Sequence, residues 1–380
     1  MQSIPDKLNN LLEKRKLENS LRRLSLTSEM VDFCSNDYLG FSSSSELYDT
    51  ISEKMDQLTS KSNGATGSRL ISGNSDLVER LESRVSNFFE GEAALFFNSG
   101  YNANQSILSA IPQKGDTILY DELVHASIKD GLRLGFANKI SFKHNDLEDF
   151  ERRLKNSKGD IYVVVESIYS MDGDRCPLKK LLGICKKYNA YLIVDEAHSL
   201  GVVGDKGQGI CINERVQEDV FARIYTFGKA LGVHGACVVG SQLLKQYLIN
   251  FARPFIYTTA LPHHSLVSVS CALDYLNQAK EPRKRLTENI KYFQNSMAKA
   301  KDEMMSDNMK LIESNTAIQG VIIPDNILVR NKALHLQESG LDVRAILSPT
   351  VKPGSERLRI CLHSFNTFAE IDLLISRVLE

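Results

Sequence analysis

The chain contains 380 residues, of which 42% are hydrophobic and 24% charged, with 46 basic side chains against 47 acidic ones. Such a composition is typical of a soluble globular protein that can bury one or more large cores. Because the charges nearly balance, the composition gives no electrostatic reason to expect nucleic acid or a membrane surface as the main partner.

The first predicted element is an amphipathic surface helix over residues 8–24, where leucines recur at helical spacing among Lys, Arg and Glu. Charges interrupt this segment throughout, so it lacks the apolar centre of a signal peptide, and no later run reaches the roughly 18 apolar residues of a membrane span. The seven cysteines are scattered without C-x-x-C spacing, which predicts neither a disulfide framework nor a metal site. We therefore expect a cytoplasmic protein.

The next predicted elements are short and lie on either side of a glycine-rich loop. The stretch VDFCSNDYLGF predicts a short strand and a turn, and residues 42–61 are polar and helix-like. Three glycines and several small polar residues in KSNGATGSRLISGN indicate irregular backbone. A further helix is predicted from about residue 75 to residue 89.

Apolar runs then alternate with helix-like stretches. The runs are AALFF, DTILY, KISF, IYVVVES, YLIVDEAH, ARIYTF and ACVVG. This alternation predicts crossover units and a mostly parallel sheet that is covered on both faces. Ligands of open α/β sheets lie beyond the carboxyl ends of the strands, so we expect one rim to gather the polar residues that follow these runs. They are Glu166, Asp195, His198, Thr226 and Lys229.

Beyond about Leu243 the pattern changes to long helices and then to a shorter strand-helix-strand region with a last helix. This change predicts a second, smaller domain. We expect an N-terminal helix and short strand over residues 1–45, a large domain over residues 46–275 and a small C-terminal domain over residues 276–380. The N-terminal helix is a candidate to join the small domain.

A single lysine, Lys229, stands in the stretch YTFGKALGVHGA just after a predicted buried strand. An ammonium group is almost never fully buried without a partner, so this position calls for one, and a covalently bound carbonyl cofactor would serve. The segment VDEAH places Asp195 and His198 at the exit of another buried strand. Alone, this pair could be a helix cap and a solvent-facing histidine, and no second histidine or carboxylate pair completes a metal-ligand set. The segment GDKGQG lacks dinucleotide-binding spacing and predicts a loop.

A pyridoxal phosphate site needs four kinds of group, and the sequence offers a candidate for each. An amine must bind the aldehyde and an acid must pair with the pyridine nitrogen, roles that Lys229 and Asp195 fit. A flat group must lie against the ring, and His125 in DELVHAS fits that role. Donors at a helix N-terminus must bind the phosphate, which Gly100 and Tyr101 in NSGYNAN can provide.

Nine segments in their order along the chain make the sequence similar to the α-oxoamine synthases, which are pyridoxal-phosphate enzymes of aminotransferase fold type I. The segments are SNDYLGF, GATGSRLISGN, FFNSGYNANQ, DELVHASIKDGLRL, ESIYSMDGDRCPL, IVDEAHSLGVVGDKGQG, YTFGKALGVHGACVVGS, FARPFIYTTALP and SPTVKPGSERLRICL. The resemblance covers nearly the whole chain. It implies a large domain with a mostly parallel seven-stranded sheet between helices, together with a smaller C-terminal α/β domain.

The resemblance also implies how the residues would bind the cofactor. Lys229 would hold it covalently, Asp195 would pair with the pyridine nitrogen, His198 would hydrogen-bond the phenolic oxygen and His125 would stack on the ring, and these four are the implied catalytic residues. The other implied cofactor contacts are Gly100, Tyr101, Ser170 and Thr226. Thr258 and Thr259 would reach the phosphate of a neighbouring subunit, because the family forms its active sites at a dimer interface.

For the substrates, the resemblance implies that Asn36 and Arg359 hold the amino-acid carboxylate while Thr350 and Arg22 line the acyl side, with His125 also at the substrate. Each assignment has a structural alternative. Arg359 and Arg357 alternate on a strand and share a face, so one could be a sheet-surface charge. Arg22 lies on a charged helix, where solvated faces are the norm.

The activity implied is the decarboxylative condensation of L-alanine with a pimeloyl thioester, carried by acyl carrier protein or coenzyme A, as in biotin biosynthesis. Three alternatives stay open: a related synthase that uses glycine or serine with another acyl-CoA, an aminotransferase or aldolase of the same fold, and a non-catalytic binding protein. The chain departs from the family pattern at Ser199, Leu200 and His234, which leaves the shape of the acyl site open.

Overall fold

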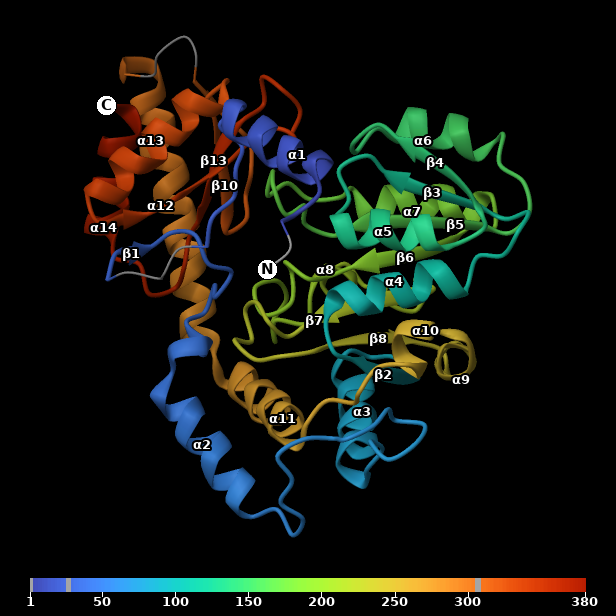
Figure 1. Cartoon of the computed structure of the whole chain (residues 1–380). Coiled ribbons are helices and arrows are strands. Elements are labelled where there is room, and N and C mark those ends of the chain that lie inside the picture. Colours follow the sequence, from blue (N-terminus) through green and yellow to red (C-terminus); the bar gives the residue numbers. More distant parts are fainter. Residues whose placement is uncertain (1–2, 25–28, 305–308) are drawn as a thin grey trace. The chain divides into compact units, whose positions relative to one another are not determined.

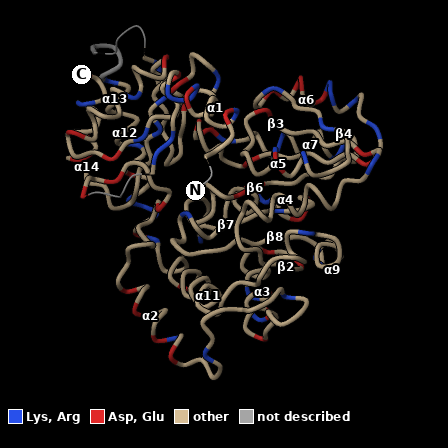
Figure 2. The backbone as a smooth tube through the Cα atoms, viewed as in Figure 1, with Lys and Arg blue, Asp and Glu red and all other residues tan. Residues whose placement is uncertain are grey.

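The computed structural model describes residues 3–24, 29–304 and 309–380. The chain divides into two compact units, which are described separately below. The larger consists of Asn36–Ser170 and Asp174–Lys284, and the smaller of Met1–Ser35, Met171–Gly173 and Arg285–Glu380. Basic and acidic residues are interspersed along the chain (Figure 2). Within the described ranges, no helix is both long and apolar enough to cross a membrane.

The larger unit is built on a seven-stranded sheet with the order β2-β8-β7-β6-β5-β3-β4 (Figure 1). Its strands are β2 (Ala93–Phe97), β3 (Thr117–Asp121), β4 (Asn138–Phe142), β5 (Ile161–Glu166), β6 (Tyr191–Asp195), β7 (Ala222–Thr226) and β8 (Ala236–Gly240). Only β8 runs antiparallel to its neighbours, and the remaining pairs are parallel. The expected fold class and the mostly parallel sheet are thus confirmed.

Helices α4 to α8 connect the successive strands from β2 to β7, as crossover connections require, whereas β7 leads to β8 without a helix. They are α2 (Ser45–Asp56), α3 (Asp76–Phe88), α4 (Gly100–Ala110), α5 (Ala126–Leu134), α6 (Leu147–Leu154), α7 (Leu178–Lys187), α8 (Ile210–Asn213), α9 (Gln242–Phe251), α10 (Arg253–Ile256) and α11 (His263–Gln278), with the 3-10 turn Phe41–Ser43. Serine side chains cap the first turns of α2, α3 and α4, which explains where these helices begin.

Continuous burial along the central strands explains their unbroken apolar character. β5 and β6 are buried at every residue after the first, and both lie inside the sheet. Every residue of β2 is buried too, although β2 is an edge strand. A strand that is apolar on both faces must be covered on both sides, so these runs predict covered strands without deciding which of them lie at the centre of the sheet. Because β5, β6 and β7 are parallel, their carboxyl ends, Glu166, Asp195 and Thr226, meet at one rim.

The smaller unit contains a four-stranded antiparallel sheet with the order β12-β13-β10-β9 and a separate parallel pair, β1 with β11. Its elements are α1 (Asp6–Leu17), β1 (Val31–Asp32), most of α12 (Lys280–Met304), β9 (Lys310–Leu311), β10 (Ile318–Ile322), α13 (Asn326–Glu338), β11 (Leu341–Asp342), β12 (Arg344–Ile346), β13 (Arg357–Cys361) and α14 (Phe368–Leu379). A capping box at Thr367 and Glu370 begins the last helix.

The N-terminal helix is shorter than its leucine spacing predicts, so the expected extent of residues 8–24 is wrong. Helix α1 ends at Leu17, and Asn19 follows with a φ of 50°, a left-handed conformation that a helix cannot continue through. The helix buries none of its residues within the chain. Its leucines are therefore available to a partner.

Candidate functional site

A cavity of about 280 Å³ opens in the larger unit beyond the carboxyl ends of β5, β6 and β7. This volume lies close to the lower end of the range of about 300–1,000 Å³ that is usual for small-ligand pockets. Its lining residues are Asn36, Asn98, Ser99, Gly100, Tyr101, Asn104, His125, Ser127, Glu166, Asp195, Ala197, Thr226, Gly228, Lys229, His234 and Gly235. Of the polar residues that the strand ends were expected to gather, Glu166, Asp195, Thr226 and Lys229 line this cavity, whereas His198 does not.

The amine of Lys229 is held beside a buried imidazole. Lys229 Nζ lies 2.8 Å from His198 Nε2, and His198 Nδ1 lies 2.7 Å from the hydroxyl of Tyr38. That hydroxyl donates to Asn36 Oδ1 at 3.1 Å, so it accepts from His198 Nδ1, which leaves Nε2 to accept from the lysine. The chain of contacts fixes the direction in which both functional groups point.

A second chain of buried contacts holds Asp195. Its Oδ1 accepts from the backbone N–H of Ala197 at 2.9 Å, and its Oδ2 accepts from Asn104 Nδ2 at 2.8 Å. Asn104 also donates to the hydroxyl of Ser127, which lies 2.8 Å from His125 Nδ1. The carboxylate and the imidazole of His125 are thus oriented through one network that spans α4 and the start of α5.

His125 begins helix α5, and its Nδ1 accepts from the backbone N–H of Ser127. Burial lowers the pKa of His125, and the charge of Lys229 lowers it further, whereas Asp195 raises it. A neutral imidazole is therefore favoured, with its flat face free to lie against an aromatic ring at the cavity.

Glu166, at the end of β5, is a buried carboxyl group whose position the strand pattern marked but to which sequence reasoning gave no role. Burial raises its pKa to about 8, and the nearby charge of Asp195 raises it while that of Lys229 lowers it. Its Oε1 accepts from the backbone N–H of His125 at 2.5 Å. Near neutral pH this residue is mainly protonated, which limits the negative charge beside Asp195.

We expect the substitution Glu166→Gln to flatten the pH dependence of stability. Because the folded-state pKa of about 8 lies above the ordinary value of 4.5, the folded protein retains a proton that the unfolded chain releases between these pH values. The free energy of unfolding of the wild type should therefore fall as pH rises through this window, by roughly 1–3 kcal/mol from this group. Urea unfolding of the cofactor-free protein at about pH 5 and pH 8 measures this fall. An equal fall in the free energy of unfolding for the wild type and for Glu166→Gln would contradict the assignment.

The N-terminus of α4 forms an anion-binding cradle beside Thr226. Ser99 caps the helix by accepting from Asn102, while the first turn still presents backbone N–H groups without helical partners. An added Cβ at Gly100 would lie 2.3 Å from Thr226 Cγ2, so only glycine allows this approach. Thr226 Oγ1 is buried and lacks a hydrogen-bond partner among the described residues. A buried hydroxyl in this state calls for an acceptor or donor from a ligand.

These groups fit pyridoxal phosphate, the cofactor that the resemblance implies. The cavity presents a lysine amine for the aldehyde, a carboxylate for the ring nitrogen and a histidine for the ring face. The α4 N-terminus and the orphaned Thr226 hydroxyl suit the phosphate. In the described part of the chain no cluster of His, Cys, Asp and Glu suits a metal ion.

Comparison with known proteins agrees with this fit. A family model described as aminotransferase class I and II matches residues 28–378. The chain belongs to this family. Curated relatives within it include the 8-amino-7-oxononanoate synthases of Emericella nidulans, 36% identical over 98% of this chain and 94% of that protein, and of Marinobacter nauticus, 38% identical over 96% and 91%. The predicted resemblance is confirmed.

Solved structures of the aminotransferase class I and II family resemble this chain over most of its length. The serine palmitoyltransferase of Sphingomonas wittichii has a TM-score of 0.89 at 27% identity and covers 99% of this chain and 97% of its own. The 8-amino-7-oxononanoate synthase of Francisella tularensis has a TM-score of 0.78 at 31% identity, with 92% and 96% covered. A serine palmitoyltransferase has also been solved with PLP.

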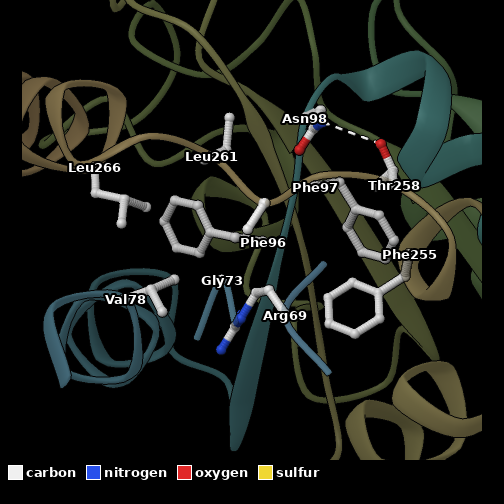
Figure 3. Close-up of a pocket in the computed structure, with 11 residues that line it drawn as sticks. Arg69, Gly73, Val78, Phe96, Phe97, Asn98, Phe255, Thr258, Leu261 and Leu266 are labelled. Atoms are coloured by element: carbon white, nitrogen blue, oxygen red, sulfur yellow. Dashed lines mark hydrogen bonds between the residues drawn. The ribbon is translucent and has the colours of Figure 1, made fainter. Parts of the chain in front are cut away.

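The cavity gathers most of the residues that the sequence assigned to cofactor binding in this family, and Asn36 with them. Ser170 is buried in the larger unit but does not line the cavity. Thr258 borders a separate, largely apolar cavity with Phe96, Phe97 and Phe255 (Figure 3). There Asn98 Nδ2 donates to Thr258 Oγ1 at 3.3 Å and to the Thr259 carbonyl at 2.9 Å.

The residues assigned to substrates lie mainly in the smaller unit. Arg22 Nη2 donates to Thr350 Oγ1 at 3.2 Å, so these two acyl-side candidates are neighbours. Arg357 and Arg359 both lie on β13 and both are buried, so neither is a sheet-surface charge. Arg357 pairs with Asp172 at 2.6 Å, which gives it a structural role. Arg359 Nη1 donates to Cys361 Sγ at 3.0 Å, and its assignment to a substrate carboxylate stays a prediction.

The departures from the family pattern divide between the core and the cavity. Ser199 and Leu200 are buried and do not line the cavity, and the Ser199 hydroxyl donates to the carboxylate of Glu196. His234 does line the cavity. Of the three, His234 is therefore the residue placed to affect which ligand fits.

Sequence reasoning missed the residues that orient the site. Asn104, Ser127 and Tyr38 make the contacts with Asp195, His125 and His198 described above. Asn104 stands four residues after Gly100 in the motif NSGYNAN, so a helix starting there turns it toward the same side as the phosphate cradle. The four-residue spacing between Gly100 and Asn104 could therefore have indicated from the sequence that Asn104 faces the site.

Proposed function

We propose that this chain is a pyridoxal-phosphate-dependent acyltransferase that condenses L-alanine with a pimeloyl thioester. The products are 8-amino-7-oxononanoate, carbon dioxide and a free thiol, and the reaction belongs to biotin biosynthesis. The observation that carries the proposal is that Lys229 and Asp195 line one cavity and that His198 contacts the Lys229 amine. The curated relatives named 8-amino-7-oxononanoate synthase match this chain over nearly their full length.

The cofactor, when bound, supplies an electron-withdrawing ring that accepts the electron pair left on the α-carbon of the amino acid. Lys229 would hold the cofactor, and its Nζ would be the group that removes the α-proton. His198 lies within hydrogen-bond distance of this nitrogen and keeps it directed at the site. The Asp195 carboxylate would pair with the ring nitrogen and favour its protonated form.

The remaining assigned residues bind and orient. His125 would stack on the ring, while Gly100, Tyr101 and Thr226 would hold the phosphate through backbone N–H groups and the Thr226 hydroxyl. Ser170 is buried in the loop after β5 and does not line the cavity, so it would act on the cofactor only through neighbouring residues. Asn104 prevents Asp195 from rotating, because its amide donates to one carboxylate oxygen while a backbone N–H holds the other.

On the substrate side, Arg359 and Asn36 hold the carboxylate of the amino acid, and a fixed carboxylate sets which bond of the α-carbon is broken. Arg22 and Thr350 line the acyl side. A guanidinium suits the free carboxylate at the far end of a pimeloyl chain, because the two groups can form paired hydrogen bonds.

The enzyme acts as a homodimer with shared active sites, in which Thr258 and Thr259 reach the phosphate of the neighbouring copy. It works in the cytoplasm. All seven cysteines are free thiols, as a reducing compartment requires.

A second candidate function is a synthase that uses serine or glycine. It is favoured by the TM-score of 0.89 to serine palmitoyltransferase, against 0.78 to the solved 8-amino-7-oxononanoate synthase. Sequence identity favours the first candidate, at 31% against 27% in the same two comparisons.

The test supplies the purified, cofactor-loaded enzyme with pimeloyl-CoA and with L-alanine, glycine or L-serine in turn. Product mass, carbon dioxide and free thiol are measured together. We expect L-alanine to give a kcat/KM at least about tenfold above the other two, since discrimination of one methyl or hydroxyl group is usually worth that much. Product from serine or glycine alone would establish the second candidate instead.

A further inference from the structure

His234 is a histidine of the cofactor cavity to which the proposed chemistry gives no task. It is exposed, and it lines the cavity together with Lys229. No hydrogen bond, ion pair or ring contact joins the His234 imidazole to another residue in the described part of the chain. An exposed histidine is ordinarily a solvated surface group. One that lines a ligand cavity with both ring nitrogens unengaged is, in addition, available to the ligand.

The loop that carries Lys229 also fixes the position of His234. Two backbone hydrogen bonds close this loop, from the Phe227 N–H to the Gly235 carbonyl at 2.9 Å and from the Val233 N–H to the Phe227 carbonyl at 3.0 Å. Gly235 has a φ of 118°, a conformation that favours glycine, and it directs the chain into β8. Lys229 and His234 therefore belong to one short, closed loop.

Strand pairing places His234 at the end of the cavity where the phosphate cradle lies. β8 lies between β2 and β7 in the sheet (Figure 1), and its first residue, Ala236, pairs with Phe97 of β2 and with Thr226 of β7. Because both pairings are antiparallel, the residues just before Ala236 lie beyond the carboxyl ends of β2 and β7. The residues that lead into helix α4 lie beyond the same end of β2. His234 therefore lies beside the cradle.

The order of the strands separates His234 from the groups assigned to the cofactor ring. β8 lies on one side of β7, whereas β6, which ends at Asp195, lies on the other. His125 follows β3, which lies farther along the sheet on that same other side. The two groups assigned to the ring thus come from beyond β7, while His234 comes from the side of β2 and α4. This position favours a contact with the phosphate over a contact with the ring.

The phosphate donors assigned above carry no full charge. A phosphate monoester carries about 1.5–2 negative charges near neutral pH. Among the described residues that line the cavity, Lys229 is the sole lysine and no arginine occurs. The Lys229 amine contacts His198 and is assigned to the cofactor aldehyde. The N–H groups of α4 and the Thr226 hydroxyl therefore leave room for a further donor, above all for one that can be a cation.

We propose that His234 is a further phosphate-binding residue, whose imidazole donates an N–H to a phosphate oxygen of the cofactor. A neutral imidazole has one N–H and a protonated imidazole has two, so either form can donate. The protonated form makes a charge-assisted hydrogen bond. The proposal rests on the cofactor of the proposed function, and it does not depend on which amino acid or thioester the enzyme uses.

The test measures how tightly the cofactor-free enzyme binds pyridoxal phosphate and pyridoxal, which is the same aldehyde without the phosphate. Absorbance titration of the wild type and of H234A gives both dissociation constants for each protein. The variant H335A is the matched control, because it removes an exposed histidine of α13 that does not line the cavity. The variant H234R replaces the imidazole with another N–H donor for phosphate.

We expect H234A to raise the Kd for pyridoxal phosphate at least about fivefold, because a hydrogen bond to a charged group is lost. The Kd for pyridoxal should change less than about twofold, because that ligand has no phosphate for His234 to bind. The variant H234R should bind pyridoxal phosphate within about threefold of the wild type. The phosphorus NMR resonance of the bound cofactor should shift in H234A but not in H335A.

Two outcomes would overturn the proposal while the proposed function stands. An equal rise in Kd for both aldehydes would assign His234 to the cofactor ring or to the fold of the loop. Unchanged affinity of H234A for pyridoxal phosphate is the other, and a higher KM for the acyl donor would then assign His234 to the substrate. Failure of the wild type to bind pyridoxal phosphate would instead refute the proposed function.

Discussion

Replacing Lys229 with alanine should abolish turnover, with kcat/KM at least about 10³-fold lower. The amine has two proposed tasks, covalent attachment of the cofactor and movement of the α-proton, and loss of a proton-transferring group alone costs about 10²–10⁴-fold. Coupled assay of the released thiol measures the loss. Borohydride reduction followed by peptide mass analysis should find the cofactor attached at Lys229 in the wild type and at no lysine in the variant.

The control for this variant is Lys206→Ala, since Lys206 is an exposed lysine in the loop between β6 and α8. It should keep full activity and the label at Lys229. Label on a different lysine of the wild type, or activity of the alanine variant above about a tenth of normal, would show that another amine does this work.

The second large effect is expected for Asp195→Asn, which should lower kcat by about 100- to 1,000-fold. A loss of this size is comparable to that caused by removing one preorganised charge-stabilising group. The side chain keeps its size but loses the negative charge opposite the ring nitrogen. Both carboxylate oxygens accept hydrogen bonds, from Asn104 and from the backbone of Ala197, so an amide must place one N–H against a donor. A loss of about 1 kcal/mol of stability should follow.

A purely structural role for Asp195 would predict a different pattern. In that case the free energy of unfolding would fall far enough for the loss of folded enzyme to account for the lost activity. The cofactor affinity of the folded enzyme would change little. Titration of the cofactor by its absorbance, together with urea unfolding, separates the two. The conservative Asp195→Glu variant should restore part of the rate if charge is what matters.

The large sheet could be predicted because its strands are apolar without interruption. Runs such as IYVVVE in β5 and YLIVD in β6 bury both faces, and that need is visible in composition alone. The proximity of Asp195 and Lys229 could be predicted because parallel strands end at the same edge of the sheet. This inference requires no knowledge of side-chain contacts. The end of α1 was missed because leucine spacing continues past Leu17, whereas the left-handed Asn19 stops the helix.

The contacts that orient the site could not be predicted in this way. Asn104 reaches Asp195 across 91 residues of sequence and Tyr38 reaches His198 across 160, and no periodic pattern encodes such pairs.

The pairing of β1 with β11 has a consequence for how the chain is made. Val31 lies opposite Leu341, a partner that leaves the ribosome 310 residues later (341 minus 31). At a synthesis rate of about 5–20 residues per second, this strand waits roughly 15–60 s before its partner exists. During that delay the emerging N-terminal segment, with its exposed leucines, has to remain soluble or be sheltered by a chaperone.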